Sequence, residues 1–198
     1  MASRLWLITA GAFAALALLA WPFDNAALLW HPDQPWRAFT APFAHLSWMH
    51  LLANLAGCAA VGILGQVARL PPQASAAWLL AWPLTQWGLL LRPDLTSYGG
   101  LSGVVHAGVA IIAIGLLATP GRRRNVGLAL FAGLALKLWL EEPFGPAVQL
   151  RSGWDIAIAP FAHLTGVIAG SVAAIALRSW GRPSSRQAVS SKAATHDS

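Results

Sequence analysis

The sequence predicts an all-α membrane protein, a bundle of six transmembrane helices with both termini in the cytoplasm. Hydrophobic residues make up 57% of the 198 residues and charged residues only 10%. This is too little charge to cover the surface of a soluble domain of this length. Six apolar stretches approach the ~20 residues that a helix needs to cross a bilayer. The basic residues lie mainly between alternate stretches, as in proteins that obey the positive-inside rule.

The six apolar stretches define the predicted helices. We expect helices at residues 5–22, 43–64, 74–91, 102–118, 125–140 and 154–178. The fourth and fifth are short, so they need a thin bilayer or a loop that dips inward. The first resembles a secretory signal peptide, but its long apolar run and the poor cleavage site at Trp21-Pro22-Phe23 favour a retained helix. One membrane domain therefore spans residues 1–178, and 179–198 is predicted to be a disordered, basic cytoplasmic tail.

Basic residues set the predicted orientation. With the N-terminus inside, nine lie in inner loops and tails and three in outer loops, which fixes both termini in the cytoplasm. The net charge of +6 could indicate nucleic-acid binding, but the basic residues are dispersed and adjoin no nucleic-acid-reading motif, so no such partner is expected. A single cysteine, Cys58, excludes a disulfide. The inner residues are Arg4, Arg69, Arg122, Arg123, Arg124, Arg178, Arg182, Arg186 and Lys192, and the outer ones are Arg37, Arg92 and Arg151.

Polar side chains inside the predicted spans are candidates for function, because they are costly to place in lipid. The stretch "HLSWMHLLANL" puts His50 and Asn54 four residues apart on one helix face. The sixth span carries His163 in "PFAHLTGVIAG". With a rise of about 1.5 Å per residue, His50 lies about 10 Å below Phe43 and His163 about 13 Å below Trp154. These two histidines are therefore predicted to lie at a similar depth.

Ser102, at the start of the fourth span, reaches that depth only if the loop 92–101 folds into the protein. The pair Gly99-Gly100 permits the tight turn that this requires. Small residues on the fourth and sixth spans then allow the two helices to pack backbone to backbone, which brings His163 beside Ser102. These small residues are Gly103 and Ala107 on the fourth span, and Gly166 and Gly170 on the sixth.

Such a cluster predicts serine chemistry. An imidazole can take the proton from a serine hydroxyl and return it to a leaving amine, so His163 is the expected base for Ser102. The side chains of His50 and Asn54 and the Ser102 backbone N–H could stabilise an oxyanion. No buried acid is evident that would orient His163, so we expect a Ser–His dyad and not a triad. Alone, Ser102 would more often be a helix cap, but its neighbours favour the nucleophile.

His106, one turn after Ser102, has two interpretations. It could itself be the base, but two residues four apart on one helix leave little room for a substrate carbonyl. We expect it to pack against His163 or to hydrogen-bond beside it. His45, nearer the outer end of the second span, is expected to brace a loop, and Arg37 to bind backbone carbonyls or lipid headgroups.

Four motifs in order resemble the rhomboid intramembrane serine proteases, over residues 36–170. They are the Trp36-Arg37 element, "HLSWMHLLANL", "GLSG" and "AHLTG" with the later Gly170. The resemblance implies a six-helix rhomboid-like bundle with Ser102 as nucleophile and His163 as base. It also implies an oxyanion hole formed by His50, Asn54 and the Ser102 amide. The supporting positions are His106, Gly100, Gly103, His45, Trp36, Arg37, Gly166 and Gly170.

Two departures from the family pattern narrow the resemblance. Many relatives carry tyrosine where this chain has His106, and the chain is minimal in length. The stretch "GLSGVVHAG" is similar to the rhombosortase subgroup, which is associated with bacterial proteins that bear a C-terminal Gly-Gly membrane tail. This resemblance implies a multi-pass enzyme of the bacterial inner membrane that processes such sorting tails. Its site would open toward the periplasm and would use no cofactor and no metal.

Three other functions remain open. The chain could be a rhomboid protease of general single-span substrates. It could be a metal-dependent membrane enzyme that uses His45, His50, His106 and His163, although no HExxH motif is present. It could also be a catalytically silent rhomboid-like protein that binds membrane clients, or a small transporter, although both the serine and the histidine are retained.

Overall fold

The computed structural model describes residues 2–180, which form six α-helices and four short 3-10 helices. Within this range β-pairing is limited to two isolated bridges, Trp30–Tyr98 and Gln149–Ile158, so the all-α prediction is confirmed. Residues 181–198 of the predicted tail lie outside the described residues. The α-helices are α1 (Ala2–Ala20), α2 (Trp48–Val67), α3 (Pro72–Trp87), α4 (Ser102–Leu117), α5 (Arg122–Glu141) and α6 (Pro160–Trp180).

Helices α2 and α6 begin later than the apolar stretches predicted. Helix α2 starts at Trp48 because the Ser47 hydroxyl caps it, accepting a hydrogen bond from the His50 N–H at 3.1 Å. Helix α6 starts at Pro160, a residue that suits a first helical turn because it has no N–H to satisfy. The predicted depths of His50 and His163 are therefore wrong, since residues 43–47 and 154–159 are not α-helical. Both histidines lie instead in the first turn of their helices.

Helix α5 is longer than predicted, and α6 extends past the predicted boundary at residue 178. The α5 helix has 20 residues because it includes Arg122, Arg123 and Arg124, which an apolar criterion excludes. Helix α4, with 16 residues, is short as predicted. By length and composition α2 and residues Pro160–Leu177 of α6 could each cross a membrane, and Arg4–Ala20 and α4 are shorter apolar helices. The six-span topology remains a prediction.

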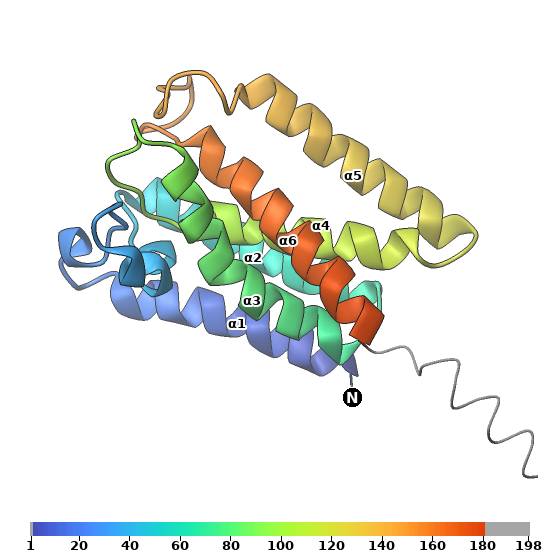
Figure 1. Ribbon diagram of the computed structural model, residues 1–198. Coiled ribbons are helices and arrows are strands. Elements are labelled where there is room, and N and C mark those ends of the chain that lie inside the picture. Colours follow the sequence, from blue (N-terminus) through green and yellow to red (C-terminus); the bar gives the residue numbers. More distant parts are fainter. Residues whose placement is uncertain (1, 181–198) are drawn as a thin grey trace, which may run out of the picture.

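The outer surface of the bundle is apolar. Large aliphatic side chains are exposed on α1, α2, α3, α5 and α6; Ile8, for example, is 64% exposed, Ile63 62% and Val172 56%. A water-soluble protein rarely exposes so many large apolar side chains together, whereas a bilayer solvates them. The start of α1 and the end of α6 lie at the same end of the bundle (Figure 1). An even number of membrane crossings would require this arrangement.

Two buried tryptophans join the first four helices. The rings of Trp6 and Trp78 stack with centroids 4.4 Å apart. The Trp6 indole N–H donates to the Val61 carbonyl at 2.9 Å, and that of Trp78 donates to the Val104 carbonyl at 2.7 Å. Each indole therefore buries its ring and satisfies its polar atom on a neighbouring helix.

Helices α4 and α6 pack backbone to backbone through glycine. A Cβ atom at Gly166 would overlap the carbonyl oxygen of Gly103, and one at Gly170 would overlap that of Ala107. A Cβ at Gly103 would in turn lie 2.7 Å from the carbonyl oxygen of Ala162. The strips of small residues predicted from the sequence therefore form the α4–α6 contact.

Substitution of Gly166 by alanine should destabilise the protein by about 1–3 kcal/mol, because the added methyl group must push α4 and α6 apart. Gly133→Ala on α5 is the matched control, because nothing lies within 4 Å of its Cβ position. Removing a helical glycine there should leave stability unchanged or raise it by up to about 1 kcal/mol. Thermal unfolding of both variants in detergent micelles measures the difference. Equal stability of the two variants would contradict the close α4–α6 contact.

Candidate active site

Ser102 and His163 meet where α4 and α6 begin. The Ser102 Oγ lies 3.0 Å from the His163 Nε2, within hydrogen-bonding distance. Ser102 is the first residue of α4, and Leu101 occupies the cap position without a side-chain capping bond. The interpretation of Ser102 as a helix cap is therefore wrong, because its hydroxyl faces side chains of other segments.

The loop before α4 packs into the bundle and sets the position of Ser102. Gly100 has a φ of +119°, a conformation that glycine adopts readily, and its N–H donates to the Ala41 carbonyl at 2.9 Å. Tyr98 pairs with Trp30 through backbone hydrogen bonds of 2.8 and 3.1 Å. A Cβ atom at Gly100 would lie 2.5 Å from the His50 Nε2, so the loop closely approaches the imidazole.

Tyr98 is a site residue that the sequence analysis missed. Its hydroxyl lies 3.1 Å from the Ser102 Oγ and 3.1 Å from the Gly100 carbonyl oxygen. Burial raises the pKa of Tyr98, so the phenol stays protonated and can donate to either oxygen. Tyr98 is the one tyrosine in the chain, four residues before Ser102. A search for polar residues within apolar spans does not find Tyr98, because it lies in a loop outside every such span.

His50 and Asn54 lie beside the same cavity as Ser102 and His163. The Leu46 N–H approaches the His50 Nδ1 at 3.5 Å, which leaves Nε2 to carry the proton on the side facing Gly100. The Asn54 side-chain amide donates one N–H to the His50 carbonyl at 3.1 Å, and its second N–H remains for another acceptor. The Ser102 N–H, in the first turn of α4, has no intrahelical carbonyl to bond. Three donors thus belong to residues that line the same cavity as the hydroxyl.

His106 lies flat against His163. Their rings stack with centroids 4.2 Å apart and planes 14° apart, which is the packing contact expected from the sequence. The His106 Nδ1 lies 2.6 Å from the Ser102 carbonyl oxygen, so this nitrogen is the donor and carries the proton. His106 is therefore bonded to the backbone of Ser102 and not to its hydroxyl.

An acid does adjoin His163, so the expectation that no acid lies beside this histidine is wrong. The Glu141 Oε2 lies 2.7 Å from the His163 Nδ1, and the Glu141 side chain is only 14% exposed. Glu141 is the last residue of α5. The sequence analysis did not find Glu141, because nothing in the local sequence shows that the end of α5 returns to the start of α6.

Of the remaining predicted supporting residues, His45 and Arg37 hold loops. His45 is buried, its Nδ1 lies 3.0 Å from the Phe43 carbonyl oxygen, and burial lowers its pKa, so it is a neutral brace. The Arg37 guanidinium donates to the backbone carbonyls of Ala26 at 2.9 Å and Leu29 at 3.2 Å. Trp36 is 64% exposed and contributes no atom to the cavity lining.

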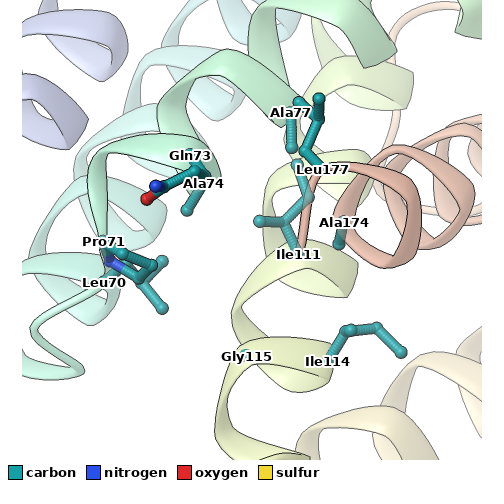
Figure 2. Close-up of a pocket in the computed structure, with 10 residues that line it drawn as sticks. All are labelled: Leu70, Pro71, Gln73, Ala74, Ala77, Ile111, Ile114, Gly115, Ala174 and Leu177. Carbon is teal, nitrogen blue, oxygen red and sulfur yellow. The ribbon is translucent and has the colours of Figure 1, made fainter. Parts of the chain in front are cut away.

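The polar residues surround a cavity of about 450 Å³, which the loop between α5 and α6 also lines. A second cavity, of about 380 Å³, lies at the opposite ends of α4 and α6 (Figure 2). Its lining is apolar except for Gln73 and contains no titratable or nucleophilic side chain. Of these two cavities, only the first can support acid–base chemistry.

The donor atoms of His106, Glu141 and His163 lie within 4.8 Å of one another, the spacing of a possible metal site. A metal lies in the plane of each imidazole that binds it, along the nitrogen lone pair. The two rings are stacked with nearly parallel planes, so both cannot direct a lone pair at one ion without turning. His45 and His50 lie outside this group. The geometry therefore does not fit the four-histidine metal site considered from the sequence.

The comparisons with known proteins identify the family. The Rhomboid domain matches residues 32–180, a range that includes every residue of the site described above. The chain belongs to the rhomboid family. This assignment supports a membrane location.

Curated relatives of this rhomboid chain are bacterial. It is 31% identical over 173 residues to the rhomboid protease GlpG of Yersinia pestis (strain Pestoides F), which is 84% of this chain and 55% of the relative. It is 30% identical over 164 residues to the rhomboid protease GlpG of Yersinia enterocolitica, 79% of this chain and 52% of the relative. The chain thus spans about half the length of the curated relatives it matches.

Gly100→Ala should reduce the reactivity of Ser102 toward a fluorophosphonate at least tenfold. The added methyl group would strain a positive φ, at about 1–3 kcal/mol, and would collide with His50. Gly153→Ala is the control, because Gly153 also has a positive φ, of +85°, but no atom lies within 4 Å of its Cβ position. A comparison of the labelling rates of the two variants separates the effect of backbone strain, which both share, from that of the contact with His50, which only Gly100→Ala has. Equal rates would contradict a specific role of the Gly100 turn.

Proposed function

We propose that the chain is an intramembrane serine endopeptidase in which Ser102 is the nucleophile and His163 the general base. The observation that carries the proposal is the 3.0 Å contact between the Ser102 Oγ and the His163 Nε2, beside a cavity of about 450 Å³. A polar pair is costly to place in an otherwise apolar bundle, so a serine hydroxyl in contact with an imidazole there favours a catalytic role over a structural one. The rhomboid family assignment supports the same chemistry.

The proposed reaction proceeds in two stages. His163 takes the Ser102 proton as the Oγ attacks the scissile carbonyl carbon, and the C–O bond forms while the carbonyl oxygen becomes an oxyanion. The imidazolium then donates that proton to the leaving amine and the C–N bond breaks, which leaves an acyl-enzyme. A water molecule, deprotonated by His163, then attacks the ester carbon; the C–Oγ bond breaks, His163 returns the proton to the Ser102 Oγ, and the carboxylic acid product leaves.

The proposed oxyanion hole consists of the Ser102 backbone N–H, the His50 Nε2–H and the second N–H of Asn54. Each is a donor that the described hydrogen bonds leave available, and all three adjoin the same cavity. Donors held in place before the reaction stabilise the developing negative charge without reorganising. Removal of one such donor typically lowers kcat by about 10²–10³-fold.

Water and substrate are proposed to enter from the outer face of the bacterial inner membrane. The cavity lies where α2, α4 and α6 begin, and charge asymmetry predicts that this end faces the periplasm. Val148 and Trp154, from the loop between α5 and α6, line this cavity together with residues of the helices. The proposed partners are the lipid bilayer, which surrounds the bundle, and a membrane protein substrate, which would enter at this end. No cofactor is required for the reaction.

The proposed substrates are exported bacterial proteins with a C-terminal transmembrane tail that begins at Gly-Gly. The similarity of "GLSGVVHAG" to the rhombosortase subgroup supports this class, and His106 within it stacks on His163. The alternative is a protease of general single-span substrates, which is favoured by the relatives named rhomboid protease GlpG. A catalytically silent client-binding protein is the rival from another class.

A fluorophosphonate probe should label the wild-type chain covalently, and Ser102→Ala should abolish the label. His163→Ala should slow labelling by about 10⁴-fold or more, because the hydroxyl loses its base. Labelling should survive a chelator, since serine chemistry needs no metal. In-gel fluorescence of purified protein, with and without the chelator, provides the measurement. An unlabelled wild-type chain would indicate a silent protein, and loss of activity with the chelator would indicate a metalloenzyme.

Co-expression with a protein that ends in Gly-Gly, an apolar helix and a basic tail should yield a shortened product. The product should be absent with Ser102→Ala, as immunoblotting of the substrate reveals. An ordinary single-span rhomboid substrate serves as the comparison. Cleavage of that substrate together with an intact Gly-Gly protein would contradict the sorting-tail class and leave the peptidase proposal standing.

A further inference from the structure

We infer that Glu141 is a positioning residue that completes a Ser102–His163–Glu141 triad from a separate helix. The inference deepens the proposed function and rests on it, because it concerns the base of that reaction. A Ser–His pair alone leaves the imidazole free to rotate or to change tautomer. A carboxylate at the far nitrogen removes both freedoms.

The contacts fix which nitrogen of His163 carries the proton. An ionised carboxylate can only accept hydrogen bonds, so the His163 Nδ1, 2.7 Å from the Glu141 Oε2, must be the donor. The Nε2 is then unprotonated, and its lone pair faces the Ser102 Oγ at 3.0 Å. This is the tautomer that a general base requires.

Neighbouring charges favour the ionised form of Glu141. The Lys137 Nζ lies 2.5 Å from the other carboxylate oxygen, Oε1, one helical turn earlier on α5. The two oxygens of the Glu141 carboxylate therefore have one partner each, an ammonium and an imidazole. Another titratable neighbour is His106, which stacks on His163 and directs its Nδ1 to the Ser102 carbonyl oxygen.

The acid and the Ser–His pair come from different helices. Helix α5 packs mainly on α4 and lies at the edge of the bundle (Figure 1). Its last residue, Glu141, still reaches His163 on α6. The Arg151 guanidinium donates to the Glu141 carbonyl at 3.1 Å and so holds the end of α5. A shift of the end of α5 would therefore withdraw the carboxylate and release the base.

During the reaction Glu141 neither gains nor loses a covalent bond. The Ser102 proton moves to the His163 Nε2, and the Nδ1 proton stays on the imidazolium, hydrogen-bonded to the carboxylate. The negative charge of Glu141 stabilises this cation. The proton that came from Ser102 later passes from Nε2 to the leaving amine. Glu141 therefore acts through His163 and touches no substrate atom.

Glu141→Gln should lower kcat by about 10–100-fold with KM unchanged, the range expected when a hydrogen bond to a charged group is lost. The fluorophosphonate labelling rate of Ser102 should fall by the same factor. Glu141→Asp, which keeps the charge, should recover part of the rate. Glu142→Gln is the matched control, because this neighbouring acid is exposed and does not line the cavity; it should retain wild-type kcat.

Nitrogen-15 NMR of labelled histidine in micelles reads the tautomer of His163 without any substrate. The wild-type chain should show the Nδ1–H tautomer, and Glu141→Gln should lose that preference, with unchanged thermal stability. Equal labelling rates and an unchanged tautomer in Glu141→Gln would overturn the triad. A wild-type chain that labels nowhere would instead overturn the proposed function, and the NMR signal would still decide whether Glu141 orients His163.

Discussion

The close contact of α4 and α6 is the constraint on which the rest of the site depends. Glycines at 103 and 166 let the two backbones touch, and this contact lies next to the residues that carry the hydroxyl and the imidazole. Ser102 is the first residue of α4 and His163 the fourth of α6, so a small change in the separation of the helix ends would change their distance directly. Packing and chemistry are therefore set by the same few residues.

The site gathers polar groups at helix beginnings, where backbone donors are unpaired. Ser102, His50 and His163 all lie in first turns, and an irregular loop precedes each helix. The loops contribute groups of their own, above all the Tyr98 hydroxyl and the Gly100 turn. The polar side chains at this end of the bundle hydrogen-bond to one another. The outer surface of the bundle can therefore stay apolar and compatible with lipid.

The arrangement brings three separate helices together around the base. His163 on α6 contacts Ser102 and stacks on His106, both on α4, while Glu141 comes from α5. Helix α5 packs mainly on α4 and has few buried residues. The orientation of the base is thus sensitive to the least firmly packed helix of the described bundle.

The sequence alone determined the helical class, the approximate helices and several polar residues that line the cavity, because apolar runs and isolated polar residues within them are local signals. Four of these polar residues lie within apolar segments of the sequence: Ser102, His163, His50 and Asn54. Only the tertiary structure decided where α2 and α6 begin, since a cap at Ser47 outweighs an apolar run that starts earlier. Glu141 and Tyr98 also needed the structure. They lie at a helix end and in a loop, where polar residues are ordinary, and only the folding of distant segments brings them to His163 and Ser102.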